Sequence, residues 1–137
     1  MKTAAKVSIF IVEDDAHFRE TFVDVMSLRG IEARAAGSAA EAMALLDGHA
    51  PSLIVIDAQL PDMHGFDLCR RLRHREGLRR TPILLLSAAP QYNDPRDRID
   101  GIVAGASSFL TKPVTMERLW AEIEALVSPK SSSKAWS

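Results

Sequence analysis

Short, uninterrupted hydrophobic runs are the feature that most constrains how this chain can fold. Val7–Val12 and Leu53–Ile56 are apolar at nearly every position rather than at alternate ones. Such runs are typical of parallel strands that are buried on both faces of a sheet. Ile83–Leu86 and Phe109–Leu110 are shorter runs of the same kind, and Ile31–Ala35 is a weaker one that we expect at a sheet edge. The sequence therefore predicts five strands.

The stretches between and after these runs have the periodicity of amphipathic helices. The first expected helix spans about Ala16–Arg29, the second runs from the Ser38–Glu41 capping box to Gly48, and the third spans about Phe66–Arg75. The fourth begins at Pro95, with Asp94 as its cap. The fifth runs from a Thr115 cap to about Val127. In the fourth helix we expect Ile99, Ile102 and Val103 to face the core. Five alternations of strand and helix predict an α/β fold, a doubly wound three-layer sandwich with helices on both faces.

Length and composition indicate one domain without a general affinity for nucleic acid or membrane. The chain has 137 residues, 47% of them hydrophobic and 26% charged, with a net charge of −1. We assign residues 6–127 to the domain and residues 128–137, which are small and polar, to a flexible tail or linker. The apolar runs are too short to span a bilayer. The single cysteine, Cys69, suits a reducing cytoplasm and is expected to be buried.

Polar residues directly follow four of the hydrophobic runs: Glu13-Asp14-Asp15, Asp57, Ser87 and Lys112. In an open parallel sheet the carboxyl ends of the strands meet at one edge, where ligands bind. We therefore expect these side chains to share one pocket. Asp15 either belongs to the acidic group or caps the helix that follows it.

This set of residues predicts a metal-assisted phosphoryl-transfer site. Two carboxylates about 4 Å apart repel by roughly 4 kcal/mol at an effective dielectric constant of about 20, so the cluster favours a bound cation. Oxygen ligands favour Mg²⁺ or Mn²⁺ over zinc. Asp57 would then be the nucleophile that forms an acyl phosphate. Lys112 and the Ser87 hydroxyl would bind the remaining phosphoryl oxygens.

Four segments resemble the receiver domains of two-component response regulators: Ile9–Asp15 (IFIVEDD), Asp57–Gly65 (DAQLPDMHG), Leu86–Ala88 (LSA) and Gly105–Pro113 (GASSFLTKP). The resemblance extends from about Lys6 to Val127. It implies a flavodoxin-like sheet of strand order 2-1-3-4-5 with five helices. It also implies a signalling domain rather than an enzyme, one that catalyses only its own phosphorylation and dephosphorylation. The interval from Ser87 to Lys112 is a few residues longer than receivers usually show, with the surplus in Pro90–Pro95.

The resemblance also implies individual roles. Asp57 is the phosphoacceptor and a metal ligand, Asp14 is a direct Mg²⁺ ligand, the main-chain carbonyl of Gln59 is the third protein ligand, and Glu13 acts through water. Ser87 and Phe109 form the switch pair, and Lys112 contacts the phosphoryl group next to a cis Lys112–Pro113 peptide bond.

The implied partner is a histidine kinase or a histidine phosphotransfer protein. Phosphorylation would change the face built from the last two helices and the strand between them, and so control a partner or an output domain. A phosphorylation-dependent homodimer is one such outcome, whereas direct nucleic-acid binding by this domain and membrane association are not expected. Trp120, beside the apolar stripe of the last helix, either anchors a partner on that face or is partly buried in the core.

Other readings of the same residues fit less well. A phosphohydrolase with an aspartyl-phosphate intermediate has a second Asp two residues after the nucleophile, but here that residue is Gln59, which cannot act as a general acid or base. A nucleotide-binding domain would carry a glycine-rich phosphate loop, and neither common form of that motif occurs. A receiver that serves only as an unphosphorylated scaffold would not need the complete set of acceptor residues.

Overall fold

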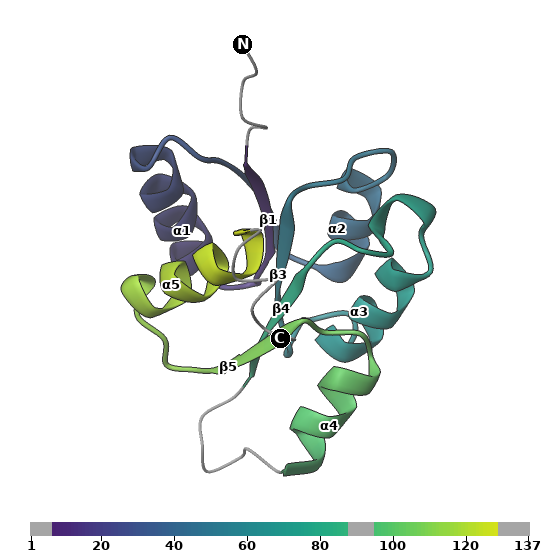
Figure 1. The fold of residues 1–137 in the computed structure, drawn as a ribbon. Helices are drawn as coiled ribbons and strands as arrows, with labels where there is room; N and C mark the ends of the chain where they lie inside the picture. Colours follow the sequence, from purple (N-terminus) through teal and green to yellow (C-terminus); the bar gives the residue numbers. More distant parts are fainter. Residues whose placement is uncertain (1–6, 88–94, 129–137) are drawn as a thin grey trace.

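The computed structural model describes residues 7–87 and 95–128, which form a three-layer α/β sandwich (Figure 1). The strands are β1 (Ser8–Val12), β2 (Glu32–Ala36), β3 (Leu53–Asp57), β4 (Ile83–Ser87) and β5 (Ser108–Thr111). All neighbouring strands pair in parallel, in the order β2-β1-β3-β4-β5. The predicted fold and strand order are therefore confirmed.

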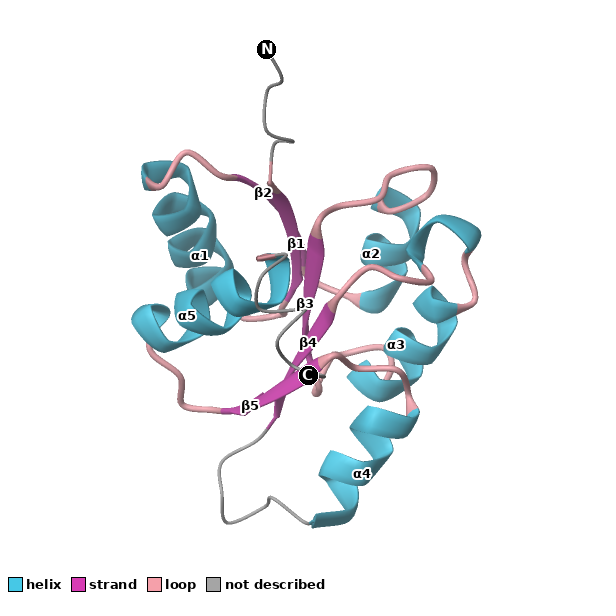
Figure 2. Ribbon diagram, viewed as in Figure 1, coloured by secondary structure: helices cyan, strands magenta, loops and turns pink. Residues whose placement is uncertain are grey.

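Helices cover both faces of the sheet, as Figure 2 shows. They are α1 (Ala16–Leu28), α2 (Ala39–Leu45), α3 (Gly65–Arg73), α4 (Pro95–Val103) and α5 (Met116–Val127). The helices α1 and α5 lie on one face, and α2, α3 and α4 lie on the other (Figure 1). A short 3₁₀ helix, η1 (Glu76–Leu78), follows α3 and was not predicted. Within the described ranges, every helix is too short or too polar to cross a membrane.

Side chains at the predicted positions cap the N-termini of three helices. They accept a backbone N–H from the first turn: Asp15 from Phe18, Ser38 from Glu41 and Thr115 from Arg118. Asp15 is thus a helix cap, which decides between its two predicted roles. Asp94, the predicted cap of α4, lies outside the described residues.

The sheet separates two hydrophobic cores, because the side chains of each strand alternate between its faces. The core under α1 and α5 contains Ile9, Ile11, Phe22, Met26, Val55, Leu84, Leu86, Leu119 and Ile123. The core under α2 and α3 contains Phe10, Val12, Ile54, Ile56, Leu68, Cys69, Leu72 and Leu85. As predicted, the Cys69 thiol is buried, and burial raises its pKa to about 11. The central strands are buried on both faces, and this packing fixes the positions of their carboxyl ends.

The prediction that Ile99, Ile102 and Val103 face the core is wrong. Their exposed fractions are 58%, 66% and 72%. Among the α4 residues whose burial is described, Gly101 is the buried one, and Ala104 directly after the helix is buried as well. A Cβ atom added at Gly101 would lie 3.1 Å from the Phe109 ring and 3.2 Å from a Leu85 methyl group, so the missing side chain lets α4 approach the sheet closely. This close approach turns the large apolar residues outward.

Candidate functional site

The carboxyl ends of four neighbouring strands bring the predicted residues to one pocket. Asp57 and Ser87 are the last residues of β3 and β4, Glu13 and Asp14 follow β1, and Lys112 follows β5. The pocket has a volume of about 620 Å³ and is lined by Glu13, Asp14, Asp15, Asp57, Gln59, Leu60, Pro61, Ser87 and Lys112. Parallel pairing alone accounts for this convergence, because it aligns the strand ends at the same edge.

Three carboxylates form a tight acidic cluster in this pocket. Each of Glu13, Asp14 and Asp57 offers an oxygen atom, and these atoms all lie within 4.8 Å of one another. Glu13 and Asp57 are only 1% and 6% exposed, whereas Asp14 is exposed to solvent. The set contains no His or Cys side chain, so its chemistry fits a hard divalent cation such as Mg²⁺ or Mn²⁺ better than zinc.

Lys112 connects two of the acids. Its Nζ atom donates to Glu13 Oε1 at 2.7 Å and to Asp57 Oδ2 at 3.2 Å, and it lies 5.3 Å from the centre of the Phe18 ring. Partial burial disfavours the charged ammonium, yet the hydrogen bonds and charges of Glu13 and Asp57 outweigh that cost and raise the pKa of Lys112. The lysine therefore carries its positive charge next to the Asp57 carboxylate.

One lysine does not balance three acids. Burial raises the pKa of Glu13 to about 7, although the hydrogen bonds from Lys112 and from the Asp15 backbone N–H favour the ionised form. The neighbouring charge of Asp57 acts in the same direction as burial and contributes to this raised pKa of Glu13. A divalent cation at the cluster would compensate this excess of negative charge, which supports the assignment of a metal site.

Backbone contacts fix the position of the Asp57 carboxylate. The backbone N–H of Gln59 donates to Asp57 Oδ1 at 3.1 Å. The N–H of Ala58 donates to Leu86 O at 2.7 Å, and Ala58 O accepts from the N–H of Gly65 at 2.7 Å. The turn after β3 is thus tied to β4 and to the start of α3, so that Asp57 is held on a short and well-supported segment.

Two predicted residues lie away from the pocket. Phe109, in β5, packs against the core under α3 and lies 6.2 Å from the Phe66 ring, measured between ring centres. Trp120, in α5, is half-buried against the other core, and the Arg29 guanidinium lies 4.7 Å from the centre of its ring. Phe66 belongs to α3 and Arg29 directly follows α1, so these contacts place both side chains away from the acidic pocket. The Lys112–Pro113 peptide bond beside the pocket is cis.

Three residues that support the site were not predicted from the sequence. Arg19, in α1, donates from Nη1 to the main-chain oxygen of Glu13 at 2.8 Å and so holds the loop after β1. Asp62 contacts the beginning of α2, and Gly65 lies against the backbone of Asp57. A single sequence carries no signal for these contacts, because each depends on a loop conformation that is fixed only in the folded chain.

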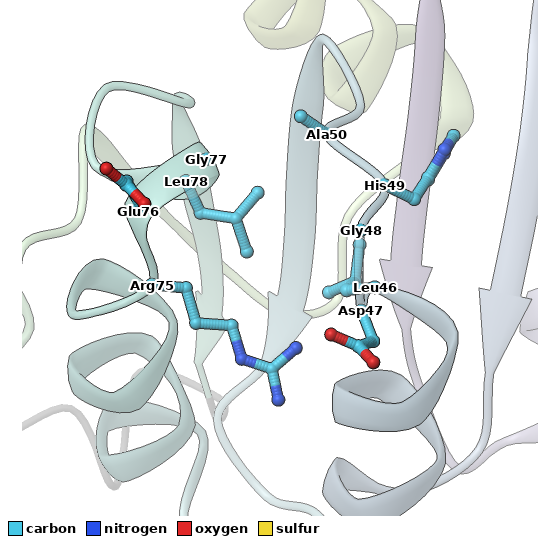
Figure 3. A pocket seen from close by; sticks show the side chains of 9 residues that line it. All are labelled: Leu46, Asp47, Gly48, His49, Ala50, Arg75, Glu76, Gly77 and Leu78. Atoms are coloured by element: carbon cyan, nitrogen blue, oxygen red, sulfur yellow. The ribbon is translucent and has the colours of Figure 1, made fainter.

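A second hollow, of about 500 Å³, lies near the amino ends of β3 and β4, between the end of α2 and η1 (Figure 3). The buried side chains of Leu46 and Leu78 contribute to its wall. Arg75 points across it and donates from Nη1 to Met43 O at 2.8 Å, which links the segment between α3 and η1 to α2. The charged residues that line this second hollow are of mixed sign, and none of them belongs to the acidic cluster.

Comparison with known proteins gives one consistent result. Residues 9–124 match the family model for the response regulator receiver domain. The transcriptional regulatory protein GltR of Pseudomonas aeruginosa is 36% identical over 120 residues, which cover 88% of this chain and 48% of GltR. A putative response regulator of Chloroflexus aurantiacus has a TM-score of 0.79 at 30% identity, over 90% of this chain and 98% of that one. The chemotaxis protein CheY4 of Vibrio cholerae has a TM-score of 0.82 at 25% identity, and the match covers 89% of this chain and 99% of CheY4.

The chain belongs to the response regulator receiver domain family. Receiver domains are signalling domains of two-component systems, in which histidine kinases are the partners. The chain spans about half the length of the curated relatives it matches.

Proposed function

We propose that this domain accepts a phosphoryl group on Asp57 from a histidine kinase or a histidine phosphotransfer protein, in a reaction that requires Mg²⁺. The observation that carries the proposal is the position of Asp57, which contacts Lys112 and lies within the cluster formed with Glu13 and Asp14. Family membership supports the same function. Because the buried thiol of Cys69 suits a reducing compartment, we place this function in the cytoplasm.

The residues of the pocket divide the chemistry between them. An oxygen of the Asp57 carboxylate attacks the phosphorus atom, and the bond from phosphorus to the donor's leaving group breaks, which gives an acyl phosphate. Asp14, Asp57 and the Gln59 carbonyl would hold the Mg²⁺ ion directly and Glu13 through water, and the ion would neutralise charge on the phosphoryl oxygens. Lys112 and the Ser87 hydroxyl would bind the other oxygens. Gln59 has no acid–base function, so the domain would turn over only its own phosphoryl group.

Intact-mass spectrometry tests this function directly. With Mg²⁺ and acetyl phosphate, we expect the protein to gain one phosphoryl group and the Asp57→Asn variant to gain none, because an amide oxygen is a poor nucleophile. A chelator should prevent the gain in the unsubstituted protein. Equal labelling of the Asp57→Asn variant, or labelling that does not depend on the metal, would contradict the assignment.

The output would be a change in the face formed by α4, β5 and α5. Phe109 in β5 lies against Gly101, so a rotation of its ring would be transmitted directly to α4. On its outer side α4 carries Ile99, Ile102 and Val103, whose exposed side chains suit a partner or a second copy of the domain. GltR and AfsQ1 are named as transcriptional regulators, so control of transcription is one fitting output, with contact to DNA assigned to a partner or an output domain.

Sedimentation with and without beryllofluoride, a phosphoryl mimic, tests this output. We expect activation to promote self-association or partner binding, and we expect the Ile102→Ser and Trp120→Ala variants to weaken it. Leu28→Ser is the matched control, because Leu28 is an equally apolar residue that is 87% exposed on α1. An activated protein that neither self-associates nor changes its amide exchange in residues 95–126 would exclude this switch.

A further inference from the structure

One acidic side chain of the loop between β3 and α3 binds a helix that is distant in the sequence. Asp62 Oδ1 accepts from the backbone N–H of Ala39, and Asp62 Oδ2 accepts from that of Ala40, both at 2.9 Å. These residues begin α2, and they precede Asp62 by 23 and 22 positions. Both carboxylate oxygens are therefore engaged with one helix end.

Asp62 is well suited to this contact. The first N–H groups of a helix have no acceptor within the helix, and a negative charge is favourable at that end. The two N–H groups lower the pKa of Asp62, so the carboxylate is ionised at neutral pH and its hydrogen bonds are charge-assisted. Yet α2 already has a cap of its own, because the Ser38 side chain accepts from the N–H of Glu41. The beginning of α2 does not depend on Asp62 alone.

The loop that carries Asp62 also forms one wall of the acidic pocket. Gln59, Leu60 and Pro61 line this pocket directly. The ends of the loop are held by the hydrogen bond from Gly65 to Ala58 and by the isolated pairing of Gln59 with His64. Between those ends, the Asp62 side chain hydrogen-bonds to α2, whereas at the end of the loop the His64 side chain accepts from the backbone N–H of Phe66 and caps α3.

We propose that Asp62 is a positioning residue for the metal site: it fastens the loop after β3 to the beginning of α2 and so holds the Gln59 main-chain carbonyl in place for the divalent cation. This inference rests on the proposed function, in which that carbonyl is a metal ligand. Because coupling between two sites is reciprocal, cation binding should in turn strengthen the contact between Asp62 and α2.

A Mg²⁺ titration of the full chain, followed through backbone amide signals in NMR spectra, tests the inference. Asp62→Ala should weaken Mg²⁺ binding about tenfold, as expected when a group that holds a metal ligand in place is removed. Asp62→Asn keeps one acceptor oxygen and should have a smaller effect. Ser38→Ala is the matched control, because it removes a cap from the same helix without releasing the loop, and its Mg²⁺ affinity should stay within about twofold of the original.

Amide exchange gives a second measurement. If Asp62 only stabilised the fold, Mg²⁺ would not change the exchange rates at the beginning of α2. In the unsubstituted protein, Mg²⁺ should slow exchange at the Ala39 and Ala40 amides, and in Asp62→Ala this effect should disappear. Equal Mg²⁺ affinities of Asp62→Ala and the unsubstituted protein, or equal losses in Asp62→Ala and Ser38→Ala, would overturn the inference and leave the proposed function standing. An unsubstituted protein that does not bind Mg²⁺ would instead contradict the proposed function itself, and this inference with it.

Discussion

Replacing Asp14 by alanine should lower the affinity for Mg²⁺ by about a hundredfold or more and abolish phosphorylation by acetyl phosphate. Removal of a group that only supports a metal ligand already costs about ten- to a hundredfold, and Asp14 is proposed to be a ligand itself. Of the three clustered acids it is the exposed one, whereas Glu13 and Asp57 already share the Lys112 ammonium. The remaining two acids would retain too little negative charge to hold the ion.

Calorimetric titration and intact-mass spectrometry measure the two effects of Asp14→Ala. Asp15→Ala is the control, because Asp15 is the next exposed acid in the sequence but serves as the cap of α1. That variant should lose about 1 kcal/mol of stability while keeping most of its Mg²⁺ affinity. If Asp14→Ala bound Mg²⁺ as tightly as the unsubstituted protein, Asp14 would not be a metal ligand.

Replacing Gly65 by alanine should destabilise the fold by about 3 kcal/mol and also abolish phosphorylation. A Cβ atom at this position would overlap the main-chain oxygen of Asp57 and lie 2.8 Å from the Cα atom of Ala58. Both neighbours are backbone atoms of the phosphoacceptor segment and cannot move aside as a flexible side chain would. The strain would displace the residue that is proposed to carry the chemistry.

Denaturant unfolding and phosphorylation assays report both consequences of Gly65→Ala. Gly77→Ala provides the control, because a Cβ atom at Gly77 would meet nothing within 4 Å. We expect that variant to change the stability by less than about 0.5 kcal/mol. A Gly65→Ala variant that kept its stability would show that the turn after β3 can shift without cost.

The sheet and the acidic pocket could be predicted because both follow from local pattern. Runs such as Leu53–Ile56 are apolar on both faces and therefore indicate a buried parallel strand wherever they occur. Once the strands are parallel, the residue after each run is placed at the same edge, so the convergence of Asp57 with Lys112 needed no further information. The expectation of Mg²⁺ or Mn²⁺ came from the ligand chemistry alone and stays a prediction.

Predictions that depended on the contact between two elements were less successful. The spacing of Ile99, Ile102 and Val103 is that of a buried helical stripe, but the close approach at Gly101 decides which side of α4 faces the sheet. Likewise, Asp62 has the sequence context of an ordinary turn residue, and only the position of α2 beside the loop gives it two N–H partners. Periodicity describes one element at a time and does not report such pairings.

The outward orientation of the isoleucines of α4 has a thermodynamic consequence for signalling. In many switches apolar surface has to be uncovered before a partner can bind, so part of the binding energy is spent on opening the protein. In the described structure this surface is already in contact with water, and the hydrophobic free energy available for association is present before any phosphoryl group arrives. Phosphorylation then needs to change only the shape of this surface and the orientation of α4. We also expect the unphosphorylated domain to associate weakly, to an extent that rises with its concentration.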